Sequence, residues 1–219
     1  MKTVLISTPD ERPSEVAIVE TLFAAGLERF HLRKPGWKSE QVALWLESMP
    51  ARWRGQIVLH SHAHLAPCFR VGGIHFRDDG DAPEEPAPRV PPDCLTSLSC
   101  HDLAAVKRAL GRYDSIFFSP VFSSLSKPGY GPAPGHVLQE LRAILLARGP
   151  AKRRTKILAL GGVTAQRLHD CRSLGFDGVA LLGAVWNAAD PVAAFLQFQS
   201  VSIGSHPVHT TSGDGGFLQ

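Results

Sequence analysis

Eight short apolar runs recur along this chain and limit its fold more than any other feature. They occupy residues 3–7, 29–33, 56–60, 73–76, 95–99, 115–119, 156–160 and 178–182. Most are apolar at nearly every position, which is typical of parallel strands covered on both faces. Apolar residues at helical spacing follow several runs, in residues 16–23, 42–49, 103–110 and 137–145. This alternation predicts an α/β protein with a parallel sheet.

The number of strands predicts a (β/α)8 TIM barrel, built by a single domain over residues 1–199. A doubly wound open sheet is the alternative. The fourth connection, residues 78–92, is rich in proline, which forbids a regular helix and predicts an irregular loop in its place. Residues 200–219 are rich in Ser, Gly, Thr and His without periodicity, so we expect a flexible C-terminal tail.

The charge balance argues against several classes of function. With 23 Lys and Arg against 20 Asp and Glu, the net charge of +3 is too small to predict nucleic-acid binding. No apolar run approaches the roughly 20 residues that cross a bilayer, and the start of the chain does not resemble a signal peptide. The four cysteines lack metal-site or disulfide spacing, so we expect reduced thiols in a cytoplasmic protein.

Polar residues gather where the predicted strands end, which is where barrel enzymes carry their active sites. In chain order the candidates are His31, Arg33 and Lys34; His60; Asp79; Ser99 and His101; the loop from Ser119 to Lys127; Gly161 and Gly162; and Gly183 and Ala184. This concentration of cations, imidazoles and glycines predicts a pocket for an anionic ligand.

Two glycine sites follow the last two strands, Gly161-Gly162 and Gly183-Ala184. Backbone N–H groups that no side chain covers can hold a phosphate, so we expect an anion between these sites, although a Gly-Gly pair is also a common turn signal.

The loop after the sixth strand carries Lys127 among several hydroxyl groups. Such a loop can close over an anion and supply both charge and hydrogen-bond donors.

The histidines at residues 60, 62 and 64 alternate at the end of the third strand, a pattern that can present imidazoles to zinc. No further ligands are evident at matching strand ends, so we favour acid–base or hydrogen-bonding roles for His60 and His101, from adjacent strand ends. His75 lies within a predicted strand, and we interpret it as a structural histidine.

Several motifs, read in order, resemble the thiamine phosphate synthase superfamily over roughly residues 2–198. They are FHLRKP at 30–35, GIHF at 73–76, SCH at 99–101, SPVFSSLSK at 119–127, LGGV at 160–163 and GFDGVA at 175–180. The resemblance implies a (β/α) barrel and one of two activities. The synthase joins hydroxymethylpyrimidine diphosphate to thiazole phosphate with magnesium and releases pyrophosphate, and the tautomerase isomerises a thiazole carboxylate phosphate.

The resemblance also assigns roles to individual residues. It places Arg33, Ser99 and Lys127 at the pyrophosphate, Ser124 and Ser126 at thiazole phosphate, and Gly162 and Gly183 at its phosphate group. We add His31, Lys34 and Ser119 as substrate-binding residues because they close the second and sixth strands. The expected ligands are small phosphorylated substrates.

The chain departs from the family pattern at the metal. The synthase has an Asn-Asp pair where this chain has His60-Ser61, which leaves Asp79 as the candidate ligand for Mg²⁺. The catalytic histidine of the tautomerase corresponds to Ser119. Synthase is the activity we expect, with an isomerase or a non-catalytic phosphate-binding protein as alternatives. A homodimer is compatible with the sequence, which does not determine the oligomeric state.

Overall fold

The computed structural model describes residues 1–77, 90–123, 131 and 133–203. Its eight strands are parallel and form a closed barrel in chain order, with β1 hydrogen-bonded to β8. They are β1 (Lys2–Ile6), β2 (Arg29–Leu32), β3 (Ile57–Leu59), β4 (Gly73–Arg77), β5 (Leu95–Cys100), β6 (Ser115–Phe118), β7 (Lys156–Ala159) and β8 (Gly178–Leu181). Each predicted run overlaps one strand, so the predicted barrel is confirmed and the open sheet is excluded.

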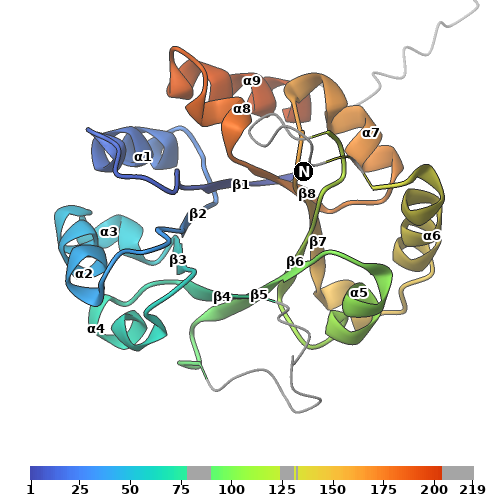
Figure 1. The fold of residues 1–219 in the computed structure, drawn as a ribbon, viewed down its shortest axis with the longest axis horizontal. Coiled ribbons are helices and arrows are strands. Elements are labelled where there is room, and N and C mark those ends of the chain that lie inside the picture. The colour runs from blue at the N-terminus through green and yellow to red at the C-terminus, as the bar shows by residue number, and fades with distance from the viewer. Residues whose placement is uncertain (78–89, 124–130, 132, 204–219) are drawn as a thin grey trace, which may run out of the picture.

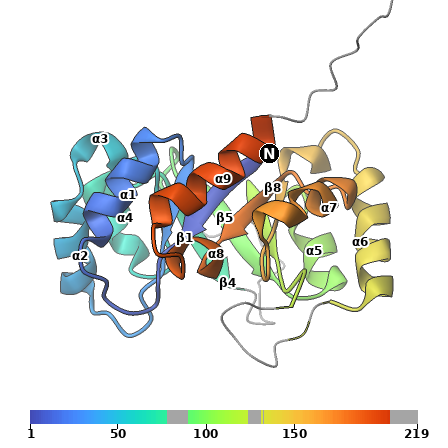
Figure 2. The ribbon, with the colours of Figure 1, turned by 90° about the horizontal axis from the view of Figure 1, so that it is seen from above.

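Helices surround this ring of strands (Figures 1 and 2). They are α1 (Glu15–Ala24), α2 (Ser39–Ser48), α3 (Ala51–Arg54), α4 (Ala66–Phe69), α5 (Leu103–Ala109), α6 (Gly135–Leu146), α7 (Leu168–Ser173), α8 (Gly183–Trp186) and α9 (Pro191–Ile203), with short 3₁₀ turns η1 (Ala63–Leu65), η2 (Lys152–Arg154) and η3 (Ala165–Arg167). In the described part of the chain, no helix is both long and apolar enough to cross a membrane.

The last helix corrects one predicted boundary. Helix α9 continues to Ile203, so the first residues of the predicted tail are helical. Phe195 and Phe198 anchor this helix in the core, and it contacts α1, α7 and α8. Residues 204–219 lie outside the described residues. The same holds for residues 78–89 of the fourth connection, whose predicted irregularity stays a prediction.

Two kinds of surface share the interior of the barrel. Strands β1, β6, β7 and β8 contribute an apolar cluster, the apolar half, made of Val4, Ile6, Phe117, Leu158 and Ala180. Strands β2, β4 and β5 contribute imidazole and hydroxyl groups, the polar half, made of His31, His75, Ser97 and Ser99. The rings of His31 and His75 contact Phe117, so the two halves meet inside the barrel.

Candidate active site

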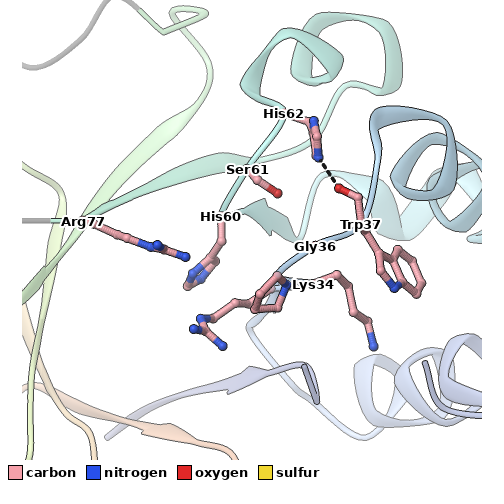
Figure 3. A pocket seen from close by; sticks show the side chains of 9 residues that line it. Lys34, Gly36, Trp37, His60, Ser61, His62 and Arg77 are labelled. Atoms are coloured by element: carbon pink, nitrogen blue, oxygen red, sulfur yellow. Dashed lines mark hydrogen bonds between the residues drawn. The ribbon is translucent and has the colours of Figure 1, made fainter. Parts of the chain in front are cut away.

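A cavity of about 350 Å³ opens at the carboxyl ends of β2, β3 and β4 (Figure 3). The residues that line it come from the segments that follow β2 and β3 and from the end of β4. They are Arg33, Lys34, Pro35, Gly36, Trp37, His60, Ser61, His62 and Arg77. The cavity therefore lies at the end of the barrel where the sequence predicts the polar groups to gather.

Two arginines make this cavity positive. Arg33 follows β2 and Arg77 ends β4, and the Arg77 side chain extends toward His60 (Figure 3). Burial, together with the charge of Arg77, lowers the pKa of the Arg33 guanidinium below its usual value. Among the described residues that line the cavity there is no carboxylate. Two positive charges on the wall of one cavity favour the binding of an anionic ligand, whose negative charge offsets both.

Lys34 has a different environment from the one we predict. Its ammonium lies 2.9 Å from Oε1 of Glu15 and donates to the carbonyl oxygen of Asp10 at 2.7 Å. It points away from His60 in Figure 3, and its side chain is fully buried. The carboxylate of Glu15 also accepts from Nε1 of Trp45 at 3.0 Å. Lys34 therefore joins the loop after β2 to α1, which corrects the prediction that its charge faces the ligand.

Three histidines from three different strands meet beside the cavity. Nδ1 of His31 lies 3.1 Å from Nε2 of His60, and the His60 ring stacks on His75 with centroids 4.0 Å apart. One nitrogen from each ring lies within 4.8 Å of the other two. His31 and His75 are buried, whereas His60 is half-buried and lines the cavity. The three rings thus extend from the cavity wall into the polar half of the barrel.

The three imidazoles are neutral at physiological pH. Burial is the largest cause that lowers each pKa. Burial together with the charges of Arg33 and Arg77 lowers the pKa of His75 to about 3, and the neighbouring histidines and the same arginines add to the effect of burial on the pKa of His60. His75 is also fixed on both sides, because its nitrogens lie 2.8 Å from the hydroxyl oxygens of Ser97 and Ser99.

The alternating histidines do not form the zinc pattern considered above. His62 Nε2 lies 2.8 Å from the carbonyl oxygen of Trp37, and His64 Nε2 lies 2.9 Å from the hydroxyl of Ser39. Both therefore stabilise the segment between β2 and α2. The metal-ligand geometry instead combines His60 with His31 and His75, which we did not group from the sequence.

His101 lies apart from His60, which corrects the prediction of adjacent strand ends. It follows β5, and β4 separates that strand from β3. Its Nδ1 lies 3.2 Å from Oγ and 3.0 Å from the carbonyl oxygen of Ser119. An imidazole is thus held directly beside Ser119, on the side of the barrel formed by β5 and β6.

The two glycine sites lie at the ends of adjacent strands, β7 and β8. Gly161 and Gly162 have positive φ angles of 93° and 63°. A Cβ atom on Gly162 would lie 2.2 Å from the carbonyl oxygen of Ser123, so only glycine fits there. Within the described residues, neither Gly161 nor Gly162 donates its N–H to a backbone carbonyl. Gly183 and Ala184 begin α8, where N–H groups have no intrahelical acceptor.

Four predicted site residues fall outside the described residues: Asp79, Ser124, Ser126 and Lys127. The residues that are described do not fit Mg²⁺. This ion takes oxygen ligands in an octahedral arrangement, usually with a carboxylate, whereas His60 and its neighbours offer imidazole nitrogens and two arginines. The expected magnesium site thus finds no anchor in the described part of the cavity.

A family model described as thiamine monophosphate synthase matches residues 3–185 of the chain. The chain belongs to the thiamine monophosphate synthase family. Within this family, the thiamine-phosphate synthase of Methylobacillus flagellatus is 30% identical over 203 residues, covering 89% of this chain and 92% of that protein. The thiamine-phosphate synthase of Methanoculleus marisnigri is 30% identical over 165 residues, covering 74% of each.

Solved structures agree with this family membership. The thiamine phosphate pyrophosphorylase of Bacteroides thetaiotaomicron superposes with a TM-score of 0.74 at 27% identity, covering 94% of this chain and all of the other. The thiamine phosphate pyrophosphorylase of Pyrococcus furiosus shares the fold, with a TM-score of 0.73 at 19% identity over 91% of this chain and 94% of the other. The predicted family is confirmed, and with it an enzyme of the transferase class.

Sequence reasoning missed Arg77 and the meeting of His31 with His75. The signal that could have found them is the period of two along a strand, since alternate residues point to the same face. Arg33 follows His31 by two residues, and Arg77 follows His75 by two. Both histidines therefore face the barrel interior, and both arginines lie one step further toward the cavity.

Proposed function

We propose that this chain is a thiamine-phosphate synthase, which joins hydroxymethylpyrimidine diphosphate to thiazole phosphate and releases pyrophosphate. The observation that carries the proposal is a family match over residues 3–185 combined with a cavity that holds Arg33 and Arg77 without a described carboxylate. A positive cavity suits a substrate whose leaving group is a diphosphate.

The reaction needs little covalent help from the protein, because the pyrimidine methylene carbon exchanges a diphosphate oxygen for the thiazole nitrogen. What the protein supplies is charge that stabilises the departing pyrophosphate. Arg33 and Arg77 serve this purpose, together with the predicted contacts of Ser99 and Lys127. Neutral His60 lines the same cavity and would offer a hydrogen bond to the pyrimidine diphosphate, while buried His31 would position it through the 3.1 Å contact between Nδ1 of His31 and Nε2 of His60.

The second substrate is proposed to bind at the other side of the barrel opening. Its phosphate would accept hydrogen bonds from the N–H groups of Gly161 and Gly162, which donate to no backbone carbonyl among the described residues, and from those of Gly183 and Ala184. Ser124 and Ser126 are proposed to complete this site, as the resemblance implies. Magnesium is expected for a synthase, but no step is assigned to it because the described residues do not fit it.

The decisive experiment supplies both substrates with and without magnesium and measures thiamine phosphate by liquid chromatography. Thiamine phosphate and an equal amount of pyrophosphate are the expected products. Absence of both products, with each substrate still bound, would favour a phosphate-binding protein without catalysis.

One observation favours a second candidate, the thiazole tautomerase activity of the superfamily. Its catalytic histidine corresponds to Ser119, and His101 holds an imidazole 3.2 Å from the Ser119 hydroxyl. If His101 replaces that histidine, His101→Asn should lower the isomerisation rate about 10²- to 10⁴-fold. The same variant should leave synthase turnover nearly unchanged if the chain is a synthase.

We further propose that the enzyme works on small phosphorylated compounds in the cytoplasm, as a homodimer. Its four cysteines, none of which forms a disulfide in the structure, agree with this location. Sedimentation equilibrium tests the dimer, and a monomeric mass at micromolar concentration would exclude it.

A further inference from the structure

The three histidines beside the cavity form a donor set of a kind that magnesium does not use. Their nitrogens come from β2, from the residue after β3, and from β4, so neighbouring strands hold all three rings. The barrel fixes these positions without the long loops. A metal ion placed between them would be held by the scaffold itself.

The spacing of the nitrogens suits a transition metal. A tetrahedral zinc ion bound at 2.0–2.1 Å by imidazoles separates their nitrogens by about 3.3 Å. Nδ1 of His31 and Nε2 of His60 are 3.1 Å apart, and His75 completes a triangle with sides of at most 4.8 Å. A movement of the His75 ring that shortens its two sides of the triangle toward about 3.3 Å would bring all three nitrogens to bonding distance.

The surroundings supply the remaining requirements of such a site. Imidazole must be neutral to bind a metal, and these three rings are neutral at physiological pH. Ser97 and Ser99 contact the two nitrogens of His75, so when one hydroxyl turns away the other still holds the ring. A hydrogen bond of this kind, on the nitrogen that does not bind the metal, is usual for ligating histidines.

Charge determines what must bind with the metal. Arg33 and Arg77 lie on the cavity side of His60, and no described lining residue offsets them. Two guanidinium groups weaken the binding of a dication on neutral imidazoles, and an anion that joins the dication offsets this repulsion. The cavity is open to such an anion, which can bridge the arginines and the ion.

We propose that His31, His60 and His75 bind one zinc-class divalent ion, and that its fourth ligand is an oxygen of a phosphate group held by Arg33 and Arg77. The site is distinct from the magnesium site expected for a synthase, because its ligands are nitrogens. It does not depend on the proposed synthase reaction, since the ion and inorganic phosphate probe it directly.

The test is a titration of the full chain, freed of metal by dialysis against a chelator, with Zn²⁺ by calorimetry and with Co²⁺ by visible absorption. One equivalent should bind, and Co²⁺ should develop the intense absorption of four-coordinate geometry. His60→Asn should weaken Zn²⁺ binding by more than about 100-fold, since even outer-shell partners are worth 10- to 100-fold. His64→Asn is the matched control, because that exposed histidine contacts Ser39 outside the cluster.

His60→Asn keeps the test valid if changes at buried His31 or His75 prevent folding, because His60 is half-buried at the cavity wall. Circular dichroism checks that each variant folds. Equal Zn²⁺ affinity in His60→Asn and His64→Asn would overturn the proposal, as would no binding of either ion to the unmodified chain.

The fourth ligand has its own test. Inorganic phosphate should tighten Co²⁺ binding by about tenfold, a coupling of the usual size between two sites. Arg77→Gln should strengthen binding of Co²⁺ alone, because it removes a repelling charge, and should reduce the effect of phosphate. A phosphate effect that is absent from the unmodified chain would overturn the shared site.

Discussion

The ammonium of Lys34 lies 2.9 Å from the carboxylate of Glu15, and both side chains are almost completely shielded from solvent. Lys34→Met would leave a buried carboxylate without its partner. We expect this variant to lose about 3 kcal/mol of unfolding free energy, measured by urea denaturation. The double variant with Glu15→Leu should recover much of that loss, because a well-packed apolar pair replaces the ion pair. Unchanged stability with weakened substrate binding would show that Lys34 faces the ligand after all.

The same carboxylate makes stability depend on pH. Burial raises the pKa of Glu15, and this outweighs the partners Lys34, Trp45 and Thr8, which lower it. The folded chain therefore keeps this proton where the unfolded chain has released it. Its contribution is fully present below the unfolded pKa of about 4.3 and decreases as pH rises through the folded value.

Glu15→Gln should remove this decrease, which is at most about 1.4 kcal/mol per pH unit. The measurement is the unfolding free energy at several pH values, compared with the unmodified chain. Glu47→Gln, at an exposed position on α2, is the control that should follow the unmodified chain. A slope that persists in Glu15→Gln would assign the dependence to another group.

Charge at the leaving pyrophosphate should dominate the synthase rate. Arg33→Gln and Lys127→Ala should each lower kcat about 10²- to 10³-fold, because each removes one donor from the departing diphosphate. Arg172→Gln, at an exposed position on α7, should have no effect. Single-turnover kinetics with both substrates measures this, and a loss confined to KM would reduce either residue to a binding role.

The glycine after β7 is required by close packing. Gly162→Ala should destabilise the fold more than Gly111→Ala, because a Cβ on Gly162 meets Ser123 and Phe122 whereas one on Gly111 meets nothing within 4 Å. Both have positive φ, so the control carries only the backbone cost, about 1–2 kcal/mol. The excess for Gly162 should be about 1–3 kcal/mol in urea denaturation. Equal losses would contradict the close approach.

Restoring the family's acidic pair should restore magnesium. His60→Asn with Ser61→Asp adds a carboxylate beside the cavity, so Mg²⁺ should bind more tightly in calorimetry and partly rescue Lys127→Ala. Zn²⁺ binding should fall in the same variant, because one of its three imidazoles is gone. No change in Mg²⁺ affinity or turnover would mean that this position never served a metal.

The strands of this barrel could be predicted because each is a short apolar run buried on both faces. For β2 and for β4 to β8 the predicted and observed starts coincide, and the ends differ by one residue. The tail was expected to begin at residue 200, whereas α9 continues to Ile203, because the Ser-rich composition starts before the helix ends. The burial of Phe195 and Phe198 and the contacts between α9 and α1 stabilise the helix, and composition does not report them.

The sequence predicts where the candidate site lies, but not which side chains contact one another there. Arg33 and His60 could be placed because each follows a predicted strand, and the order of the strands along the chain gives their order around the barrel. The partner of Lys34 comes from α1, and a charge pattern read along the chain does not show which acid a lysine meets. His31 and His75 are 44 residues apart, so their contact depends on a closed ring that only the folded chain provides.

The division of the barrel interior separates folding from chemistry. Val4, Ile6, Phe117, Leu158 and Ala180 hold one side together by apolar contact alone. The imidazoles and hydroxyls of β2, β4 and β5 lie outside that cluster and meet it at Phe117, which contacts the rings of His31 and His75. A lineage, or a protein engineer, can therefore exchange the ligand set at one side of this barrel while the other side continues to provide a stable scaffold, which makes the chain a suitable starting point for new activities on phosphorylated heterocycles.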